Sequence, residues 1–341
     1  MSPLHSSTHL FDPRPDFPLL VSVKRYYDPA TQCTDSDALT LVFAHAAGHM
    51  KEIWEPCMDE LFALVKKNGL KVNDVWSIEA PNHGEAAAMN RRLLEWCYRP
   101  IFRTEDYARA IHVVLTNAGT GIDVDFTKRR LVGIGHSFGG LGMLLSPTVS
   151  PPIPWTALIA VDVMITAPTP KAITVQNFLA ASTEKQVDTW TSLEQAREVM
   201  LKKAPWRSWD KRAFEAFSRY GLKPVDSADA TGAVTLKTSK MDTAATYRDP
   251  HGLRRCYLYL GDLVQHIPVH MVFGAVPDVM EENTRNDIID VASGGRDKLA
   301  SLKLVEGAGH LITVTHPKEL AGALSDALQA VARSPSQLAR L

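Results

Sequence analysis

The sequence lacks several features that would point to whole classes of protein. Its 37 lysines and arginines are matched by 38 aspartates and glutamates, so it has no basic excess with which to neutralise nucleic acid phosphates. No stretch approaches the roughly 18 uninterrupted apolar residues that a membrane-spanning helix needs. The polar, proline-punctuated start has no apolar segment behind a basic one, so secretion is not predicted. We therefore expect neither a nucleic acid partner nor a membrane span.

Cysteine is also scarce. The chain has four, at widely spaced positions, and none forms the Cys-x-x-Cys pair of a zinc knuckle or a redox motif. Free thiols in a reducing compartment are the ordinary interpretation of such cysteines. The sequence predicts no metal and no cofactor.

Apolar runs of strand length alternate with longer segments of helical periodicity along most of the 341 residues. The predicted strands are residues 39–43, 72–78, 131–134, 157–164, 269–273 and 302–305. Residues 52–66, residues 107–115 and a segment that opens after Pro317 are predicted helices. This alternation predicts an α/β fold whose mostly parallel sheet is flanked by helices on both faces.

The alternation breaks down between Thr166 and about Asp249. Short helices are predicted there, at residues 176–179, 193–201 and 212–219. We interpret residues 166–249 as an inserted helical lid. Residues 1–165 and 250–338 would then form the core, and residues 339–341 a separate tail.

The strongest motif is Gly-His-Ser-Phe-Gly at residues 135–139, directly after a predicted strand and before an apolar helix start. A serine in Gly-x-Ser-x-Gly sits on a strained turn that projects its hydroxyl above the sheet edge, and the glycines two positions away leave room for it. The adjoining helix N-terminus favours developing negative charge. Ser137 is therefore the predicted nucleophile.

A serine hydroxyl needs a base within hydrogen-bond reach. His310 follows a Gly-Ala-Gly segment between the last predicted strand and the last predicted helix, which places it on a loop at the carboxyl edge of the sheet. Other histidines are less suitable, because His136 lies inside the turn, His45 and His83 follow earlier strands, and His316 opens the terminal helix. We predict His310 as the base.

Residues 43–48 read Phe-Ala-His-Ala-Ala-Gly and follow an early strand. Their small side chains would let the backbone approach a substrate carbonyl. We predict an oxyanion hole formed by the N–H groups of Ala47 and of Phe138, the residue after the nucleophile. A plain Ala/Gly turn is the alternative.

Two aspartates are candidates for the acid that orients the histidine. Asp278 lies after the strand at residues 269–273, the more usual location, but its spacing from Gly274 is one residue longer than is common. Asp162 ends an apolar strand, where a carboxylate is unfavourable unless it is paired. We favour Asp162 and keep Asp278 as the alternative.

Taken together, these landmarks resemble the α/β-hydrolase superfamily over nearly the whole chain. The resemblance implies the α/β-hydrolase fold, with a helical lid inserted after the sixth strand. More narrowly, residues 43–56 and 79–85, with residues 209–212, 220–222 and 234–236 of the predicted lid, are similar to fungal peroxisomal and toxin-biosynthesis hydrolases. The acyl-CoA hydrolase of the mycophenolic acid pathway belongs to that group.

Relatives in that group can place the acid after the sixth strand, which adds to the preference for Asp162. Two departures stand against the resemblance. His-Ala-Ala replaces the usual His-Gly at the oxyanion turn, and Asp278 retains an acid that such relatives can lack. Either departure would fit a different set of catalytic residues.

These features favour a serine hydrolase that cleaves a small-molecule carboxylic ester or acyl-CoA thioester through an acyl-enzyme on Ser137. The resemblance favours the thioester. Lys51, Arg91, Arg92 and residues 202–203 are candidate contacts for CoA phosphates, although solvated charges are the more ordinary interpretation. Carbon-carbon bond hydrolysis or acyl transfer by the same residues, and a non-catalytic ligand-binding role, are the alternatives.

The last three residues, Ala339, Arg340 and Leu341, have the small-basic-leucine form of a C-terminal peroxisomal address. An accidental helix end is the alternative interpretation. We expect the peroxisomal import receptor as a partner and a peroxisomal location, with the cytoplasm as the alternative.

Overall fold

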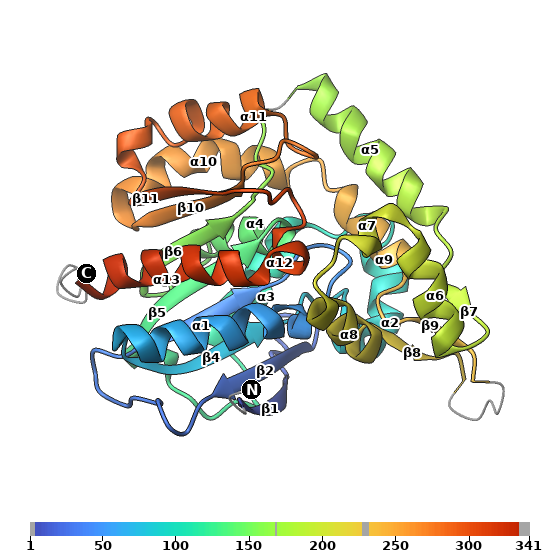
Figure 1. Cartoon of the computed structure of the whole chain (residues 1–341), viewed down its shortest axis with the longest axis horizontal. Helices are drawn as coiled ribbons and strands as arrows, with labels where there is room; N and C mark the ends of the chain where they lie inside the picture. The colour runs from blue at the N-terminus through green and yellow to red at the C-terminus, as the bar shows by residue number, and fades with distance from the viewer. Residues whose placement is uncertain (1–3, 168, 227–231, 334–341) are drawn as a thin grey trace.

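The computed structural model describes residues 4–167, 169–226 and 232–333, which contain a central eight-stranded sheet (Figure 1). Across the sheet the strands are β1 (His5–Phe11), β2 (Val21–Tyr27), β4 (Val72–Ile78), β3 (Leu39–Ala44), β5 (Arg130–His136), β6 (Trp155–Val161), β10 (Val269–Gly274) and β11 (Ser301–Val305). β1 and β2 are antiparallel to their neighbours, and all the other neighbouring pairs are parallel. The predicted fold class is confirmed.

The six strands from β3 to β11 fall on the predicted strands, with ends that differ by up to three residues. β1 and β2 were not among the predictions. β1 begins His-Ser-Ser-Thr-His and is mostly exposed, so it carries little of the apolar pattern that marks a buried strand. It adds an antiparallel edge to the sheet and lies far from the predicted nucleophile in the strand order.

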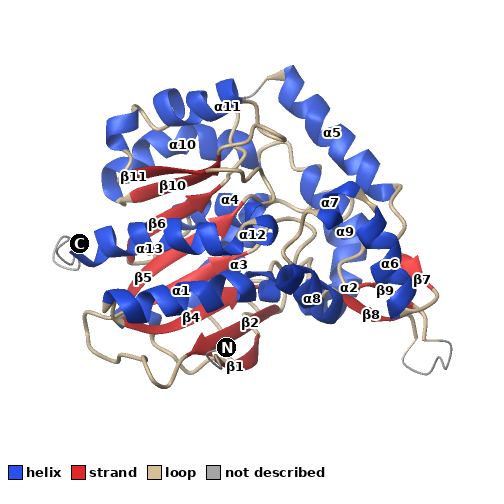
Figure 2. Ribbon diagram, viewed as in Figure 1, coloured by secondary structure: helices blue, strands red, loops and turns tan. Residues whose placement is uncertain are grey.

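Helices cover both faces of the sheet (Figure 2). The helices are α1 (Glu55–Asn68), α2 (Gly84–Leu93), α3 (Thr104–Leu115), α4 (Phe138–Leu145), α5 (Pro170–Glu184), α6 (Leu193–Lys202), α7 (Ala204–Arg207), α8 (Lys211–Tyr220), α9 (Lys240–Tyr247), α10 (Gly252–His266), α11 (Glu282–Asp287), α12 (Ile312–Thr315) and α13 (Pro317–Arg333). One buried cluster joins the sheet to α1 and α13, and a second joins it to α3, α4 and α10. Each face of the sheet therefore has its own core.

The predicted helix at residues 52–66 is divided in two. Residues Lys51–Trp54 form a short 3₁₀ turn, and α1 begins at Glu55. Pro56 explains the division, because proline has no N–H to donate within a helix and is tolerated only in the first turn.

The segment between β6 and α10 contains α5 to α9 and a small antiparallel sheet in the order β7 (Thr189–Trp190), β9 (Val234–Leu236), β8 (Leu222–Pro224). Figure 1 shows these elements, in light green to yellow, gathered at one end of the central sheet. Two predicted helices coincide with α6 and α8, and residues 176–179 lie within the longer α5. The strands were not predicted, because two or three residues are too few to show a periodic pattern.

Within the three described ranges, no helix is both long enough and apolar enough to cross a bilayer. The predicted address at residues 339–341 lies outside the described residues.

Candidate active site

Ser137 lies on the sharp turn between β5 and α4. Its backbone has φ 50° and ψ −118°, a strained conformation that takes the chain from strand to helix within one residue. A Cβ added at Gly135 would lie 2.5 Å from the Gly139 carbonyl oxygen, and one added at Gly139 would lie 2.4 Å from the Ala44 backbone. Both glycines of the motif are therefore needed for the turn to pack against the sheet edge.

Three side chains from separate loops form a chain of hydrogen bonds at the carboxyl edge of the sheet. His310 Nε2 lies 3.1 Å from Ser137 Oγ, and His310 Nδ1 lies 2.6 Å from Asp162 Oδ2. Because an ionised carboxylate only accepts, Nδ1 carries the ring proton and Nε2 accepts from the Ser137 hydroxyl. The structure thus brings together the residues predicted as nucleophile, base and favoured acid.

Asp162 directly follows β6 and is only 3% exposed. Its Oδ1 accepts a hydrogen bond from the Gly274 N–H at 2.8 Å, so each carboxylate oxygen has a donor. Burial raises the pKa of Asp162, but the hydrogen bond and charge of His310 oppose this, and the net pKa lies below its ordinary value. The acid is held ionised and aimed at the ring.

Asp278, the alternative acid, is exposed and contacts the backbone of His310 instead of its ring. Its Oδ1 accepts hydrogen bonds from the N–H groups of His310 and Val279, each at 2.8 Å. This position suits a residue that holds the histidine loop. Its carboxylate oxygens do not hydrogen-bond the imidazole, in the part of the chain that the structure describes.

The predicted oxyanion donors lie beside the serine. Ala47 and Phe138 line the same cavity as Ser137, and Phe138 is the first residue of α4. Within residues 4–167, 169–226 and 232–333, neither of their N–H groups donates to a protein acceptor. Two N–H donors without a protein acceptor, on residues that line the same cavity as a serine hydroxyl, fit an oxyanion hole.

A cavity of about 370 Å³ opens at Ser137. Most of the residues that line it lie in three ranges, 164–179, 246–253 and 279–287. The first two ranges overlap the inserted segment, residues 166–249. Its wall is mostly apolar, and the larger apolar side chains are Phe138, Leu141, Met164, Leu179, Leu253 and Met280. Sequence reasoning did not identify these residues, because their segments are separated by long stretches of chain.

The competing histidines have structural contacts elsewhere. His136 is buried, with Nε2 2.8 Å from the His310 carbonyl oxygen and Nδ1 3.2 Å from Thr313 Oγ1, so it supports the backbone of the histidine loop. Burial lowers the pKa of His136 to about 3, which keeps the ring neutral. His83 Nε2 accepts from the Gly48 N–H, His45 Nε2 accepts from the Ala80 N–H, and the His316 ring contacts Thr315.

Lys51 is neither a contact for CoA phosphates nor a solvated charge, the two interpretations that the sequence left open. Its side chain is fully buried, and its Nζ lies 2.9 to 3.4 Å from the carboxylates of Glu85, Glu52 and Glu79. An ammonium group enclosed in this way cannot meet a phosphate in solvent. Arg91, Arg92 and residues 202–203 are exposed.

Comparison with known proteins places this fold in a family. The model described as "Alpha/beta hydrolase family" matches residues 41–323 of the chain. The type I acyl-CoA thioesterase mpaH of Penicillium roqueforti is 25% identical over 237 residues, which are 67% of this chain and 51% of that protein. The chain thus spans about half the length of this curated relative.

One yeast protein and one bacterial protein extend the comparison. The peroxisomal membrane protein LPX1 of Saccharomyces cerevisiae is 28% identical over 128 residues, 38% of this chain and 32% of that protein. The solved structure of Lpx1 superimposes with a TM-score of 0.74 at 18% identity and covers 99% of this chain and 92% of its own. An esterase of M. tuberculosis gives a TM-score of 0.63 at 16% identity, with 96% and 93% covered. At these identities the structural likeness concerns the fold.

Proposed function

Because the chain belongs to the alpha/beta hydrolase family, we propose that it is a serine hydrolase, which cleaves a carboxylic ester or an acyl-CoA thioester through an acyl-enzyme on Ser137. One observation carries the proposal. Ser137 Oγ, the His310 ring and Asp162 form a continuous chain of hydrogen bonds beside a mostly apolar cavity.

In the first half of the reaction, Ser137 Oγ attacks the substrate carbonyl carbon while His310 Nε2 takes the hydroxyl proton. Asp162 stabilises the imidazolium that forms, and the N–H groups of Ala47 and Phe138 bind the oxyanion of the tetrahedral intermediate. His310 then gives the proton to the leaving alcohol or thiol, which leaves an acyl group on Ser137.

In the second half, after the alcohol or thiol has left, water is the attacking group. His310 takes a proton from the water as it adds to the acyl carbon, and returns the proton to Ser137 Oγ when the acid departs. Acyl transfer and carbon-carbon bond hydrolysis would use the same residues with a different acceptor or leaving group.

The acyl-CoA thioester is the substrate class that we favour. The relative named a type I acyl-CoA thioesterase supports this choice, since it aligns with 67% of the chain. The mostly apolar cavity supports an acyl group with a hydrocarbon chain. Residues 166–249 would act as the lid that covers the hydrocarbon chain of the bound substrate.

A peroxisomal location is part of the proposal. The curated relative named as a peroxisomal protein in yeast supports it, together with the terminal Ala339, Arg340 and Leu341 that the import receptor would bind.

The test is labelling with a fluorophosphonate probe, followed by a screen of acyl-CoAs and p-nitrophenyl esters. Wild-type protein should be labelled and Ser137→Ala should not. Ser146→Ala is the matched control, because Ser146 is a fully buried hydroxyl next to the far end of α4 whose oxygen contacts Met143 and Trp155 instead of a histidine. Unlabelled wild-type protein that turns over none of these substrates would contradict the proposal.

A further inference from the structure

A second loop lies directly behind the predicted oxyanion loop. Residues 79–86 follow the end of β4, and residues 45–51 follow the end of β3, the neighbouring strand. Because β3 and β4 are parallel, both loops leave the sheet at the same edge. Their contacts therefore bear on how the Ala47 N–H is oriented.

The first contact is made by His83, which is fully buried. Its Nε2 accepts a hydrogen bond from the Gly48 N–H at 2.9 Å, and its Nδ1 lies 2.8 Å from Asn82 Oδ1. Burial lowers the pKa of His83 well below its ordinary value, so the ring stays neutral and Nε2 keeps its lone pair for Gly48. The peptide between Ala47 and Gly48 is held by this bond.

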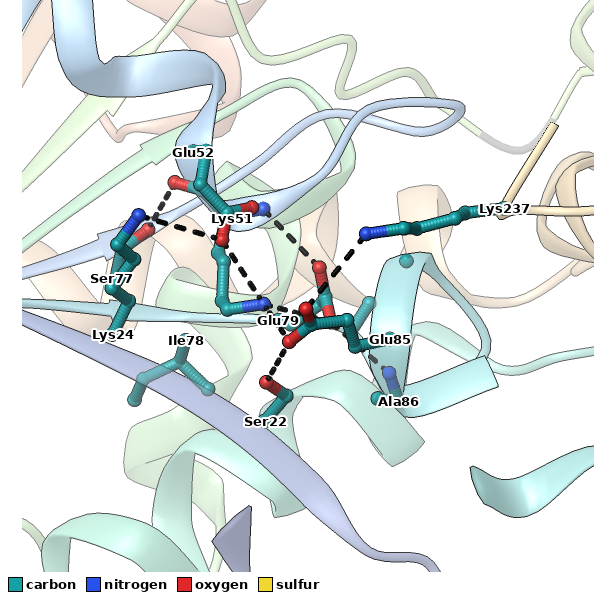
Figure 3. Close-up of polar contacts among 12 residues, drawn as sticks. Ser22, Lys24, Lys51, Glu52, Ser77, Ile78, Glu79, Glu85, Ala86 and Lys237 are labelled. Atoms are coloured by element: carbon teal, nitrogen blue, oxygen red, sulfur yellow. Dashed lines mark hydrogen bonds and ion pairs between the residues drawn. The ribbon is translucent and has the colours of Figure 1, made fainter. Parts of the chain in front are cut away.

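The second contact is made by Glu79, also fully buried. Figure 3 shows it beside Lys51. The Lys51 Nζ lies 3.4 Å from Glu79 Oε2, and the Lys51 backbone nitrogen lies 3.4 Å from Glu79 Oε1. Glu79 Oε2 also accepts from the Ala86 N–H at 3.1 Å. Glu79 thus ties the end of the oxyanion loop to its own loop.

The charges around Lys51 make this tie strong. Burial acts to lower the pKa of Lys51, but the carboxylates of Glu79, Glu52 and Glu85 raise it, and the net pKa lies above its ordinary value. Lys51 therefore stays charged inside the protein. Removing one partner of such a buried group is strongly unfavourable, because the remaining charge has no solvent around it.

We propose that His83 and Glu79 are positioning residues of the oxyanion hole: they hold Gly48 and Lys51, and so fix the backbone that carries the Ala47 N–H. This inference rests on the proposed function, in which Ala47 is an oxyanion donor. The same loop is bound to the inserted segment, because Gly84 N–H donates to Thr238 Oγ1 at 2.8 Å and Asn82 Nδ2 to the Asp242 carbonyl at 3.0 Å.

A donor that is misplaced stabilises the oxyanion less, while substrate binding through the acyl chain is unaffected. Removing an oxyanion donor outright lowers kcat by about 10²–10³-fold. Loss of a positioning contact should therefore lower kcat by about 10- to 100-fold, with KM changed less than about threefold. A merely structural role would lower the melting temperature and leave kcat of the folded protein intact.

The experiment compares His83→Leu, His83→Gln and Glu79→Gln with a matched control, Asp74→Asn. Asp74 is a fully buried carboxylate near the opposite end of the same strand, β4, paired with Arg25 and Arg129 at 2.9 and 2.7 Å. It lies roughly 17 Å from Glu79 along the strand. Each variant is measured for kcat and KM with one p-nitrophenyl ester, for inhibition by a trifluoromethyl ketone, and for melting temperature.

His83→Leu and Glu79→Gln should lower kcat and weaken ketone inhibition by similar factors, since the ketone adduct carries the same oxyanion. His83→Gln should recover most of the loss, because the Gln carbonyl can still accept from Gly48. Asp74→Asn should lower only the melting temperature. If His83→Leu does not fold, His83→Asn replaces it, because its shorter side chain cannot reach Gly48.

Variants at His83 and Glu79 that keep the kcat and ketone inhibition of Asp74→Asn would overturn the inference alone, provided that the wild-type protein reacts with the fluorophosphonate probe. Wild-type protein that neither reacts with the probe nor cleaves any ester would overturn the proposed function, and this inference with it.

Discussion

Asp162→Asn should nearly abolish turnover, and the hydrogen bonds around Asp162 give the reason. Oδ1 accepts from the Gly274 N–H, so an asparagine would keep its carbonyl oxygen there and turn its amide NH₂ toward His310 Nδ1. The ring would then have to carry its proton on Nε2. In that tautomer Nε2 cannot accept the Ser137 proton.

The size of the effect follows from this change of tautomer. Holding the histidine in the wrong tautomer lowers kcat by about 10⁴-fold, which corresponds to about 5.4 kcal/mol in the activation free energy. KM should change little, because Asp162 is buried behind the ring and does not line the cavity. The assay is steady-state hydrolysis of an acyl-CoA, with release of free CoA followed by a thiol reagent.

Asp278→Asn is the matched comparison. An asparagine there can still accept from the N–H groups of His310 and Val279, so kcat should fall by less than about threefold. A near-normal Asp162→Asn beside an inactive Asp278→Asn would refute the reasoning and make Asp278 the acid. Equal losses in both would show that the histidine loop, and not the tautomer, limits the reaction.

Three further outcomes are expected. Ala172 lies on the wall of the cavity, and Ala172→Phe should lower kcat/KM for long-chain acyl-CoAs by at least about 10-fold while kcat/KM for short-chain acyl-CoAs stays unchanged. An equal loss of kcat/KM across a chain-length series would contradict an acyl pocket there. Below pH 6.5 the unfolded chain binds a proton at His83 that the folded protein excludes. Between pH 7.5 and pH 5, the unfolding free energy of the wild type should therefore fall by about 2 kcal/mol more than that of His83→Gln, as measured by urea titration. Equal decreases in the two proteins would mean that the buried ring is not neutral. A fluorescent fusion should enter peroxisomes only while residues 339–341 are present, and import without them would reject that address.

The nucleophile and base could be predicted because their signals are local. At Gly135 and Gly139 the neighbouring backbone lies so close that there is no room for a Cβ, which is why the motif has glycine there. His310 lies between a strand and a helix that can both be recognised in the sequence. The acid was left open for a physical reason. Asp162 and Asp278 both end up against His310, and only the ring's orientation decides which carboxylate meets Nδ1.

The cavity could not be predicted in the same way. Its wall is built from segments that are far apart in the chain, and α5 shows little periodicity from which a buried face could be read. Short strands in the inserted segment are invisible for a similar reason, since two or three residues carry no pattern. β1 depends on pairing with β2, which in turn pairs with β4, more than on its own apolar content.

Lys51 marks the limit of reading charge from sequence. In the chain it stands directly before Glu52, and two adjacent opposite charges are the ordinary pattern of a solvated surface. The fold encloses it only because β4 ends beside it and delivers Glu79 and Glu85 to the same place. Burying a charged cluster of this kind gives little net stability compared with apolar packing. The position of this cluster at the end of the oxyanion loop therefore argues that it orients the loop more than it stabilises the fold. The comparison of Glu79→Gln with Asp74→Asn measures this distinction.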